Sequence, residues 1–239
     1  MLENIRPSRI IFLDIETVSA EKSYKKLSPE WKLLWDKKSN YLVKEGKQPS
    51  DIYGMSAIYA EFGKIICISV GLFTELTGER EFRVKSFYGD KEKDILTEFC
   101  EMLRKYFDSP DFLLCAHNGK EFDFPYLSRR ALVNNIKLPY LLDTAGRKPW
   151  EVQHLDTLQL WKFGDYKHYT SLDLLANLFN IKSPKSDIDG SDVGRVYWEE
   201  NDLNKIVSYC ENDVITIAQL LFAYKGIKRL AKKEIKVIR

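Results

Sequence analysis

The stretch Ile10–Thr17 constrains the fold of this chain more than any other, because it joins a buried strand to two acids. It reads Ile-Ile-Phe-Leu-Asp-Ile-Glu-Thr, and five of its first six residues are apolar. Such a run is typical of a strand buried on both faces. Side chains two residues apart on a strand point to the same face, so we predict that Asp14 and Glu16 converge near its end.

Two carboxylates that leave water together repel each other, which costs free energy unless a cation or a hydrogen-bond donor compensates them. A divalent metal such as Mg²⁺ is the natural cation, because it prefers carboxylate oxygens. The alternative is an ordinary strand that runs into an acidic turn. The spacing of Asp14 and Glu16 does not separate these two hypotheses.

The length and composition are those of an ordinary soluble protein, with 44% hydrophobic and 30% charged residues. The 239 residues fit one large domain or two small ones, and we expect a single domain over residues 1–239. A formal net charge of +2 neither demands nor excludes a nucleic-acid partner, since a local basic patch matters more than the total charge.

The sequence also predicts where such a protein resides. Its N-terminus carries Glu3, Arg6 and Arg9 and no apolar run, so we expect no signal peptide, and we expect no segment to be long and apolar enough to span a membrane. Widely spaced cysteines without a paired-cysteine pattern favour buried free thiols in a reducing compartment over disulfides. We therefore expect a cytoplasmic protein with no membrane partner. The cysteines are Cys67, Cys100, Cys115 and Cys210.

Residues 18–60 form a helical insertion after the first strand. Within it, Pro29–Lys44 places Trp31 and Trp35 among lysines, which predicts an amphipathic helix opened by Ser28. One hypothesis is a peripheral helix packed by its two tryptophans. The other is a flap that covers a substrate, because an insertion of this length in a compact domain is often functional.

Hydrophobic periodicity predicts the elements that follow. They are a central strand over Lys64–Phe73, an antiparallel strand over Arg80–Tyr88, a helix over Lys91–Phe107 and a strand over Phe112–Ala116. Asp123 follows the last of these strands and lies near the start of a helix that runs to Val133. An acid there is often only a helix cap, but it also lies where α/β sheets gather their ligands.

The segment Asp202–Tyr224 has a strong helical pattern, and Tyr209 and Asp213 share one face of it because they are four residues apart. Both lie on or beside its apolar stripe. An unpaired aspartate there destabilises the fold, so a metal or a positive partner is expected. Residues 225–239 form a basic C-terminal tail, which fits a solvated terminal helix and a nucleic-acid contact equally well.

Three motifs occur in a characteristic order. They are Asp-Ile-Glu-Thr at 14–17, Asn118 with Phe122-Asp123, and Tyr209-Cys-Glu-Asn-Asp213. Together they resemble the exonuclease motifs of the DEDD (DnaQ-like) superfamily, in its tyrosine-bearing branch. The resemblance is greatest to the proofreading exonuclease domain of B-family DNA polymerases and extends from Ile10 to about Tyr224. No polymerase region follows, so the chain resembles the stand-alone bacterial relatives of that domain.

The resemblance implies an α/β, RNase H-like fold with a mixed central sheet flanked by helices. It also implies metal-dependent 3′–5′ exonuclease activity on single-stranded or frayed DNA, with two divalent metal ions, Mg²⁺ or Mn²⁺. Asp14 would bridge both ions, Glu16 and Asp213 would complete one, and Asp123 would hold the other. Tyr209 would orient the attacking water.

Thr17, Asn118 and Phe122 match positions that hold the terminal nucleotide in that family, and the ring of Phe122 fits either base stacking or the core. The implied partners are single-stranded nucleic acid, with DNA favoured over RNA, and replication or repair proteins. Two alternatives stay open at this point. One is a 3′–5′ exoribonuclease of the same fold, and the other is a non-catalytic nucleic-acid-binding or polymerase-associated module.

Overall fold

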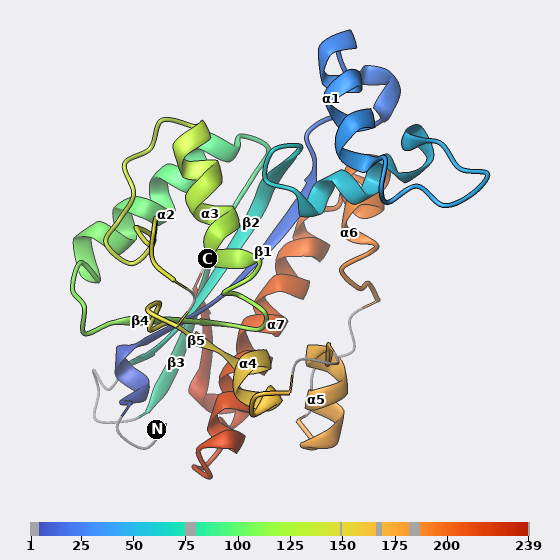
Figure 1. Cartoon of the computed structure of the whole chain (residues 1–239). Helices are drawn as coiled ribbons and strands as arrows, with labels where there is room; N and C mark the ends of the chain where they lie inside the picture. The colour runs from blue at the N-terminus through green and yellow to red at the C-terminus, as the bar shows by residue number, and fades with distance from the viewer. Residues whose placement is uncertain (1–4, 75–79, 149, 166–168, 182–186, 239) are drawn as a thin grey trace.

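A mixed six-stranded sheet forms the centre of the protein (Figure 1). The structure is a computed structural model and describes residues 5–74, 80–148, 150–165, 169–181 and 187–238. The strand order is β5-β4-β1-β2-β3-β6. Strand β2 runs antiparallel to both of its neighbours, whereas the other pairs are parallel. The strands are β1 (Ile10–Ser19), β2 (Gly63–Thr74), β3 (Glu81–Tyr88), β4 (Leu113–Ala116), β5 (Leu155–Asp156) and β6 (Ile235–Ile238).

Helices cover both faces of this sheet, as the resemblance implied (Figure 1). On one face α2 (Glu92–Tyr106) and α3 (Asp123–Val133) pack against Ile11 and Leu13 of β1. On the other, α7 (Leu203–Tyr224) packs against Ile10 and Phe12. The alternation of β1 side chains therefore serves two cores at once. The remaining helices are α4 (Thr157–Lys162), α5 (Leu172–Leu178), α6 (Val193–Arg195) and the π-helix η5 (Val196–Glu200).

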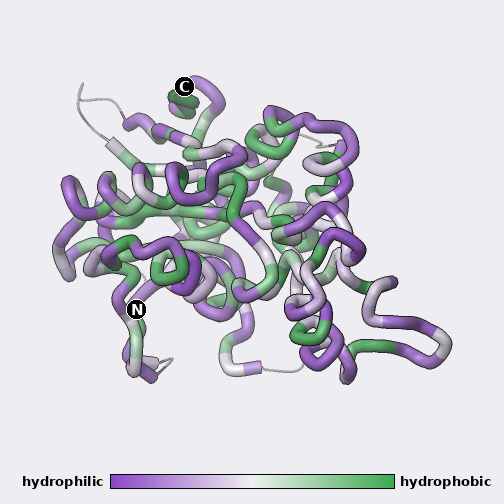
Figure 2. The backbone as a smooth tube through the Cα atoms, turned by 90° about the horizontal axis from the view of Figure 1, so that it is seen from above, coloured by the Kyte–Doolittle hydropathy of each residue, from purple (hydrophilic) through white to green (hydrophobic). Residues whose placement is uncertain are grey.

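Helix α7 corrects one expectation about membranes. Within the described residues it is the one helix long and apolar enough to pass a length and composition test for a membrane span, with a mean hydropathy of 1.2. However, 61% of that window is buried inside the protein. The apolar length of α7 is thus accounted for by its packing against the sheet. Figure 2 shows hydrophobic stretches running through the middle of the molecule, with hydrophilic turns outside.

The insertion contains the 3₁₀ helices η3 (Tyr24–Lys26) and η4 (Pro49–Ile58) around α1 (Pro29–Ser39). The Ser28 hydroxyl accepts the first-turn amide of Trp31 as an N-cap, as expected. Helix α1 ends five residues earlier than predicted, and β1 extends through Ser19 into the range assigned to the insertion.

Both tryptophans pack α1 against the protein, but unequally. Trp35 is fully buried against Tyr53 and Phe62, whereas Trp31 is 44% exposed and packs edge-on against Phe62 at 5.7 Å. The 18–60 segment is also tied to the sheet at its far end, because the Ala57 carbonyl accepts the hydroxyls of Thr17 and Tyr126, each at 2.9 Å. The insertion is therefore a packed peripheral unit whose last turn lies beside the end of β1.

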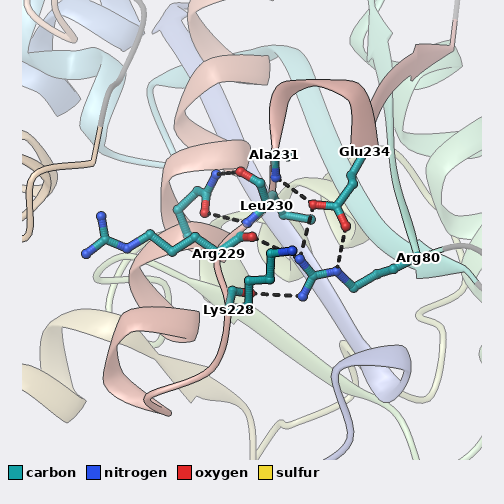
Figure 3. Close-up of polar contacts among 7 residues, drawn as sticks. Arg80, Lys228, Arg229, Leu230, Ala231 and Glu234 are labelled. Atoms are coloured by element: carbon teal, nitrogen blue, oxygen red, sulfur yellow. Dashed lines mark hydrogen bonds and ion pairs between the residues drawn. The ribbon is translucent and has the colours of Figure 1, made fainter.

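The described part of the basic tail does not form the α-helix considered above, and it is bonded to the rest of the protein. Residues Lys232–Glu234 form a 3₁₀ turn, and β6 then pairs in parallel with β3 at the edge of the sheet. Arg80 holds this turn: its guanidinium bonds Glu234 at 3.1 Å and donates to the carbonyls of Lys228 and Arg229 at 2.9 Å (Figure 3). Of the two alternatives for the tail, the solvated terminal helix was wrong, because the open edge of β3 offered the tail backbone partners, and the nucleic-acid contact stays a prediction.

Candidate functional site

The first strand carries Asp14 and Glu16 on the face that α7 covers. Asp14 lies opposite Ser69 and Glu16 opposite Cys67 of β2, and the register shifts immediately after Glu16. Such bulges are common beside functional sites, where they redirect side chains. The ligand atoms of Asp14 and Glu16, together with the sulfur of Cys210, all lie within 4.8 Å of one another. The predicted convergence of the two acids is confirmed.

Helix α7 supplies the second part of the site. The Cys210 thiol donates to the backbone carbonyl of Asp14 at 3.4 Å, and this hydrogen bond joins α7 to β1 next to the two acids. Tyr209 and Asp213 are one turn apart, and the Tyr209 hydroxyl donates to the Asp213 carboxylate. Both side chains are half-buried, so solvent reaches this side of the site.

A tight turn after β4 places the third part. Asn118 has a left-handed backbone with φ of 62°, and a Cβ on Gly119 would lie 2.4 Å from that of Ala116. The Asp156 carboxylate accepts the backbone amides of Asn118 and Lys120 at 3.0 and 3.1 Å. This turn leads directly into α3, whose first residue is Asp123, 3% exposed.

Burial raises the pKa of each of the four acids, and repulsion from nearby acids adds to this rise. The pKa of Asp14 lies well above its usual range because burial disfavours the charged form, and because Glu16, Asp213 and Asp123 are close. The pKa of Glu16 is raised well above its usual range by burial and then by Asp213, Cys67 and Asp123. The four acids from three distant segments therefore interact.

The pKa values of the other two carboxyls, Asp123 and Asp213, are also raised. Burial raises the pKa of Asp123 to about 8, although the backbone amides of Asp123 and Ile15 stabilise its charged form. Burial raises the pKa of Asp213 to about 7, and the hydrogen bond from Tyr209 opposes that rise. The pKa of Tyr209 is itself raised by burial and by Asp213, Glu16 and Asp14, so its hydroxyl stays protonated.

The donor set fits a hard divalent cation. It consists of carboxylate oxygens, and no salt bridge within the described residues reaches any of the four acids. Four desolvated carboxyls without a cationic side chain are costly to ionise, and a divalent ion relieves that cost. Cys210 lies nearby, but its thiol is buried and already donates to Asp14.

The three residues expected to hold the terminal nucleotide lie around this cluster and differ in the contacts that their side chains already make. The Thr17 hydroxyl makes a structural hydrogen bond, because it donates to the Ala57 carbonyl. Asn118 is half-buried at the turn beside β4. The ring of Phe122 lies 5.4 Å from that of Tyr126 and packs against the main core, so it is at least partly structural.

Sequence reasoning missed Tyr169 as a residue near the site. It is 65% exposed, and its ring lies 6.2 Å from that of His117, which precedes Asn118. The His117 ring nitrogens contact the Thr157 hydroxyl and the Thr170 carbonyl, both at 2.9 Å, and so hold the segment that carries Tyr169. No spacing in the sequence signals this contact, because His117 and Tyr169 are far apart in the chain.

Solved structures with a similar fold include the family B DNA polymerase from the hyperthermophilic archaeon Pyrobaculum calidifontis. The TM-score is 0.53 at 18% identity, over 92% of this chain and 24% of the polymerase chain. At that identity the likeness shows the fold alone, which is that of the polymerase exonuclease domain. The RNase H-like architecture implied by the motifs is therefore confirmed.

The sequence is also similar to a DNA polymerase of Archaeoglobus fulgidus, at 29% identity over 136 residues. That alignment covers 53% of this chain and 16% of the polymerase, so this chain corresponds to a small part of that protein. Residues 58–229 match a family described as predicted 3′–5′ exonucleases related to the exonuclease domain of PolB. This match contains the second and third motifs and spans well over half of the chain. The chain therefore belongs to this family of predicted 3′–5′ exonucleases related to the PolB exonuclease domain.

Proposed function

We propose that the protein is a metal-dependent 3′–5′ exonuclease that acts on single-stranded or frayed DNA. The observation that carries this proposal is the meeting of four acids from three separate segments, with no cationic side chain bonded to them in the described structure. A fold gains nothing from such a cluster unless a cation binds there. The family membership supplies the reaction class.

The four carboxyls are the proposed ligands of two divalent ions, Mg²⁺ or Mn²⁺. Asp14, which interacts with Glu16, Asp213 and Asp123, would be shared by both ions. Glu16 and Asp213 would help to hold one ion, and Asp123 would help to hold the other. When bound, such ions activate a water and stabilise the departing 3′ oxygen of a phosphodiester.

The protein side chains do the positioning. Tyr209 is held protonated and donates its hydroxyl hydrogen to Asp213, so its oxygen remains free to accept a hydrogen bond from the attacking water and orient it. The turn at Asn118 and the backbone around Thr17 and Phe122 flank the acids and are the proposed seat of the terminal nucleotide. DNA is favoured over RNA because the similar proteins are described as DNA polymerases, which also suggests replication or repair proteins as partners.

A time course on strands labelled at the 5′ end tests this function. Single, matched and mismatched DNA, and RNA of the same sequence, are incubated with Mg²⁺, with Mn²⁺ or with EDTA. We expect a descending ladder from full-length single-stranded DNA, faster cleavage of mismatched than matched ends, and no cleavage in EDTA. Paired ends are slower because unpairing costs free energy.

Two variants show that the activity belongs to this site. Asp14→Asn and Asp213→Asn should abolish cleavage, whereas Asp94→Asn, which changes an exposed acid of α2, should not. Immediate release of a labelled mononucleotide would mean the opposite polarity, and scattered fragments would mean an endonuclease. A ladder from RNA alone would make the protein an exoribonuclease, and strand binding without any cleavage would make it a binding module.

A further inference from the structure

An aromatic groove lies between α4, α5 and the end of α7, away from the acid cluster. It has a volume of about 730 Å³ and is lined by Trp161, Phe163, Phe179 and Tyr224, with Leu160 and Gln159 beside them. These residues come from three helical segments that meet around Leu220. Neither the three motifs nor the proposed metal ligands contribute to it.

The groove is preformed, because its rings support one another. The rings of Trp161 and Tyr224 are nearly parallel, at 17° and 6.3 Å between centroids. Phe179 packs edge-on against both, at 5.8 and 5.5 Å. Flat apolar surfaces fixed in this way suit a planar ring as ligand.

Phe163 is the exception to this packing, since 93% of its side chain is exposed. Its backbone adopts a left-handed conformation, with φ of 45°, which bulky residues rarely take. The described part of the chain offers no ring contact to it. An aromatic ring is thus presented to solvent at the wall of an aromatic groove.

The charge around the groove favours an anionic ligand. Two of the segments that contribute lining residues, 159–165 and 223–229, carry four cations against Asp165, and the third, α5, adds one acid, Asp173. Arg229 is fixed at one end, where its guanidinium donates to the carbonyls of Phe179 and Asn180 at 2.6 and 3.1 Å. The cations are Lys162, Lys225, Lys228 and Arg229.

The groove is connected to the acid cluster by α4. This helix begins at Thr157, directly after the Asp156 that holds the Asn118 turn, and Trp161 lies about one turn further along, roughly 6 Å. The exposed ring of Tyr169 contacts His117, whose ring is bonded to Thr157 at the start of α4. One further exposed ring therefore lies near the end of α4 that faces the proposed site of the terminal nucleotide.

We propose that the aromatic groove binds a base of single-stranded nucleic acid, a few nucleotides away from the bond at the acid cluster. The rings stack on the base without regard to sequence, and the surrounding cations attract the phosphates. This inference rests on the proposed function, because it treats the strand in the groove as part of the same substrate.

Binding in EDTA tests the groove separately from hydrolysis. A twelve-nucleotide single-stranded DNA is titrated into the protein, and tryptophan fluorescence and fluorescence anisotropy of the labelled strand are followed. Phe163→Ala and Lys162→Glu should each weaken binding about tenfold. The matched controls Tyr106→Ala and Lys93→Glu, exposed residues of α2 on the other side of the sheet, should leave Kd unchanged. Stacking on Trp161 should quench its fluorescence, and Trp161→Phe should remove that quenching.

A second readout uses substrate length. A dinucleotide is too short to reach the groove, so Phe163→Ala should cleave it at the wild-type rate in Mg²⁺ while losing efficiency on the twelve-nucleotide strand. Equal Kd for wild type, Phe163→Ala and Lys162→Glu would overturn the proposal, as would self-association that Phe163→Ala abolishes. If the wild type cleaves nothing, the proposed function fails, and the titration in EDTA still decides whether the groove binds a strand.

Discussion

Two of the regions that contain buried acids, the surroundings of Glu92 and the acid cluster, treat these acids in opposite ways. Glu92 of α2 is 8% exposed and fully partnered, since Arg130 donates to it twice, at 2.8 and 2.5 Å. Asn134 and the backbone amide of Ile65 add further hydrogen bonds at 2.9 and 2.8 Å. At the acid cluster, Glu16 is 7% exposed and lies beside Asp14, with no cationic side chain bonded to either in the described residues.

This difference separates the structural role of Glu92 from the proposed metal-binding role of the acid cluster. A buried carboxylate is tolerable when donors surround it, and Glu92 joins α2, α3 and β2 in this way. Among the described residues, no arginine or lysine forms a salt bridge with Asp14 or Glu16. The proposed function therefore implies that the cluster lowers the stability of the metal-free protein and that a bound cation recovers this cost.

Breaking the partnered region should give the largest effect. Glu92→Ala leaves Arg130 buried without its partner, so we expect a loss of about 3–5 kcal/mol in the free energy of unfolding. Urea denaturation measures it, and Glu98→Ala, an exposed acid of the same helix, should change it by less than about 0.5 kcal/mol. Equal effects of the two substitutions would show that the Glu92 network is not structural.

Tyr209 donates a side-chain hydrogen bond to Asp213 in the acid cluster. Tyr209→Phe removes the hydrogen bond to Asp213 and the group proposed to orient water. Turnover should fall by about 10- to 1,000-fold, or about 1.4–4 kcal/mol of transition-state stabilisation. Metal and strand binding should persist, as measured by calorimetric titration. Loss of ion binding would instead mean that Tyr209 shapes the metal site.

Metal should stabilise the acid cluster and leave the partnered region unaffected. At a free Mg²⁺ or Mn²⁺ concentration of 100 times Kd, the wild type should gain about 2.7 kcal/mol. Thermal melts with and without EDTA measure the shift. Asp14→Asn should lose most of this gain, whereas Asn134→Ala, which weakens the Glu92 network, should keep it. The same shift in wild type and Asp14→Asn would place the bound ion elsewhere.

The smallest effect is a pH dependence of the metal-free protein. The folded pKa values of Asp123 and Asp213, about 8 and about 7, lie above the unfolded value near 3.9, so the folded state keeps protons that the unfolded state has lost. Stability should therefore fall as pH rises, by about 2 kcal/mol between pH 6.5 and 8. Below pH 6.5 the lowered pKa values of His117 and His154 act in the opposite direction.

Chemical denaturation in EDTA across this range measures the slope. The double variant Asp123→Asn, Asp213→Asn should reduce the slope, and Asp14 and Glu16, whose pKa values are also raised, should account for part of what remains. Saturating Mg²⁺ should flatten the slope in the wild type. A slope that is unchanged in the double variant and in Mg²⁺ would come from groups outside the acid cluster.

The features of the site that could be predicted from the sequence follow from the local periodicity of strands and helices. The two-residue repeat of a strand put Asp14 and Glu16 on one face, and the helical repeat put Tyr209 and Asp213 on another. Asp123 was harder, because a helix cap and a metal ligand look the same in the sequence. The structure buries it at 3% exposure and brings it into electrostatic contact with Asp14, which a solvated cap would not show.

The sequence by itself determined the elements and the residue types of the acid cluster, because these depend on neighbours a few positions away. Tertiary structure decided which distant segments meet. It buried Trp35 but not Trp31, turned the basic tail into β6 at the edge beside β3, and placed Tyr169 next to His117. Each of these outcomes depends on which strand edge, core or carbonyl is left open after the other elements have packed, and no local pattern encodes that.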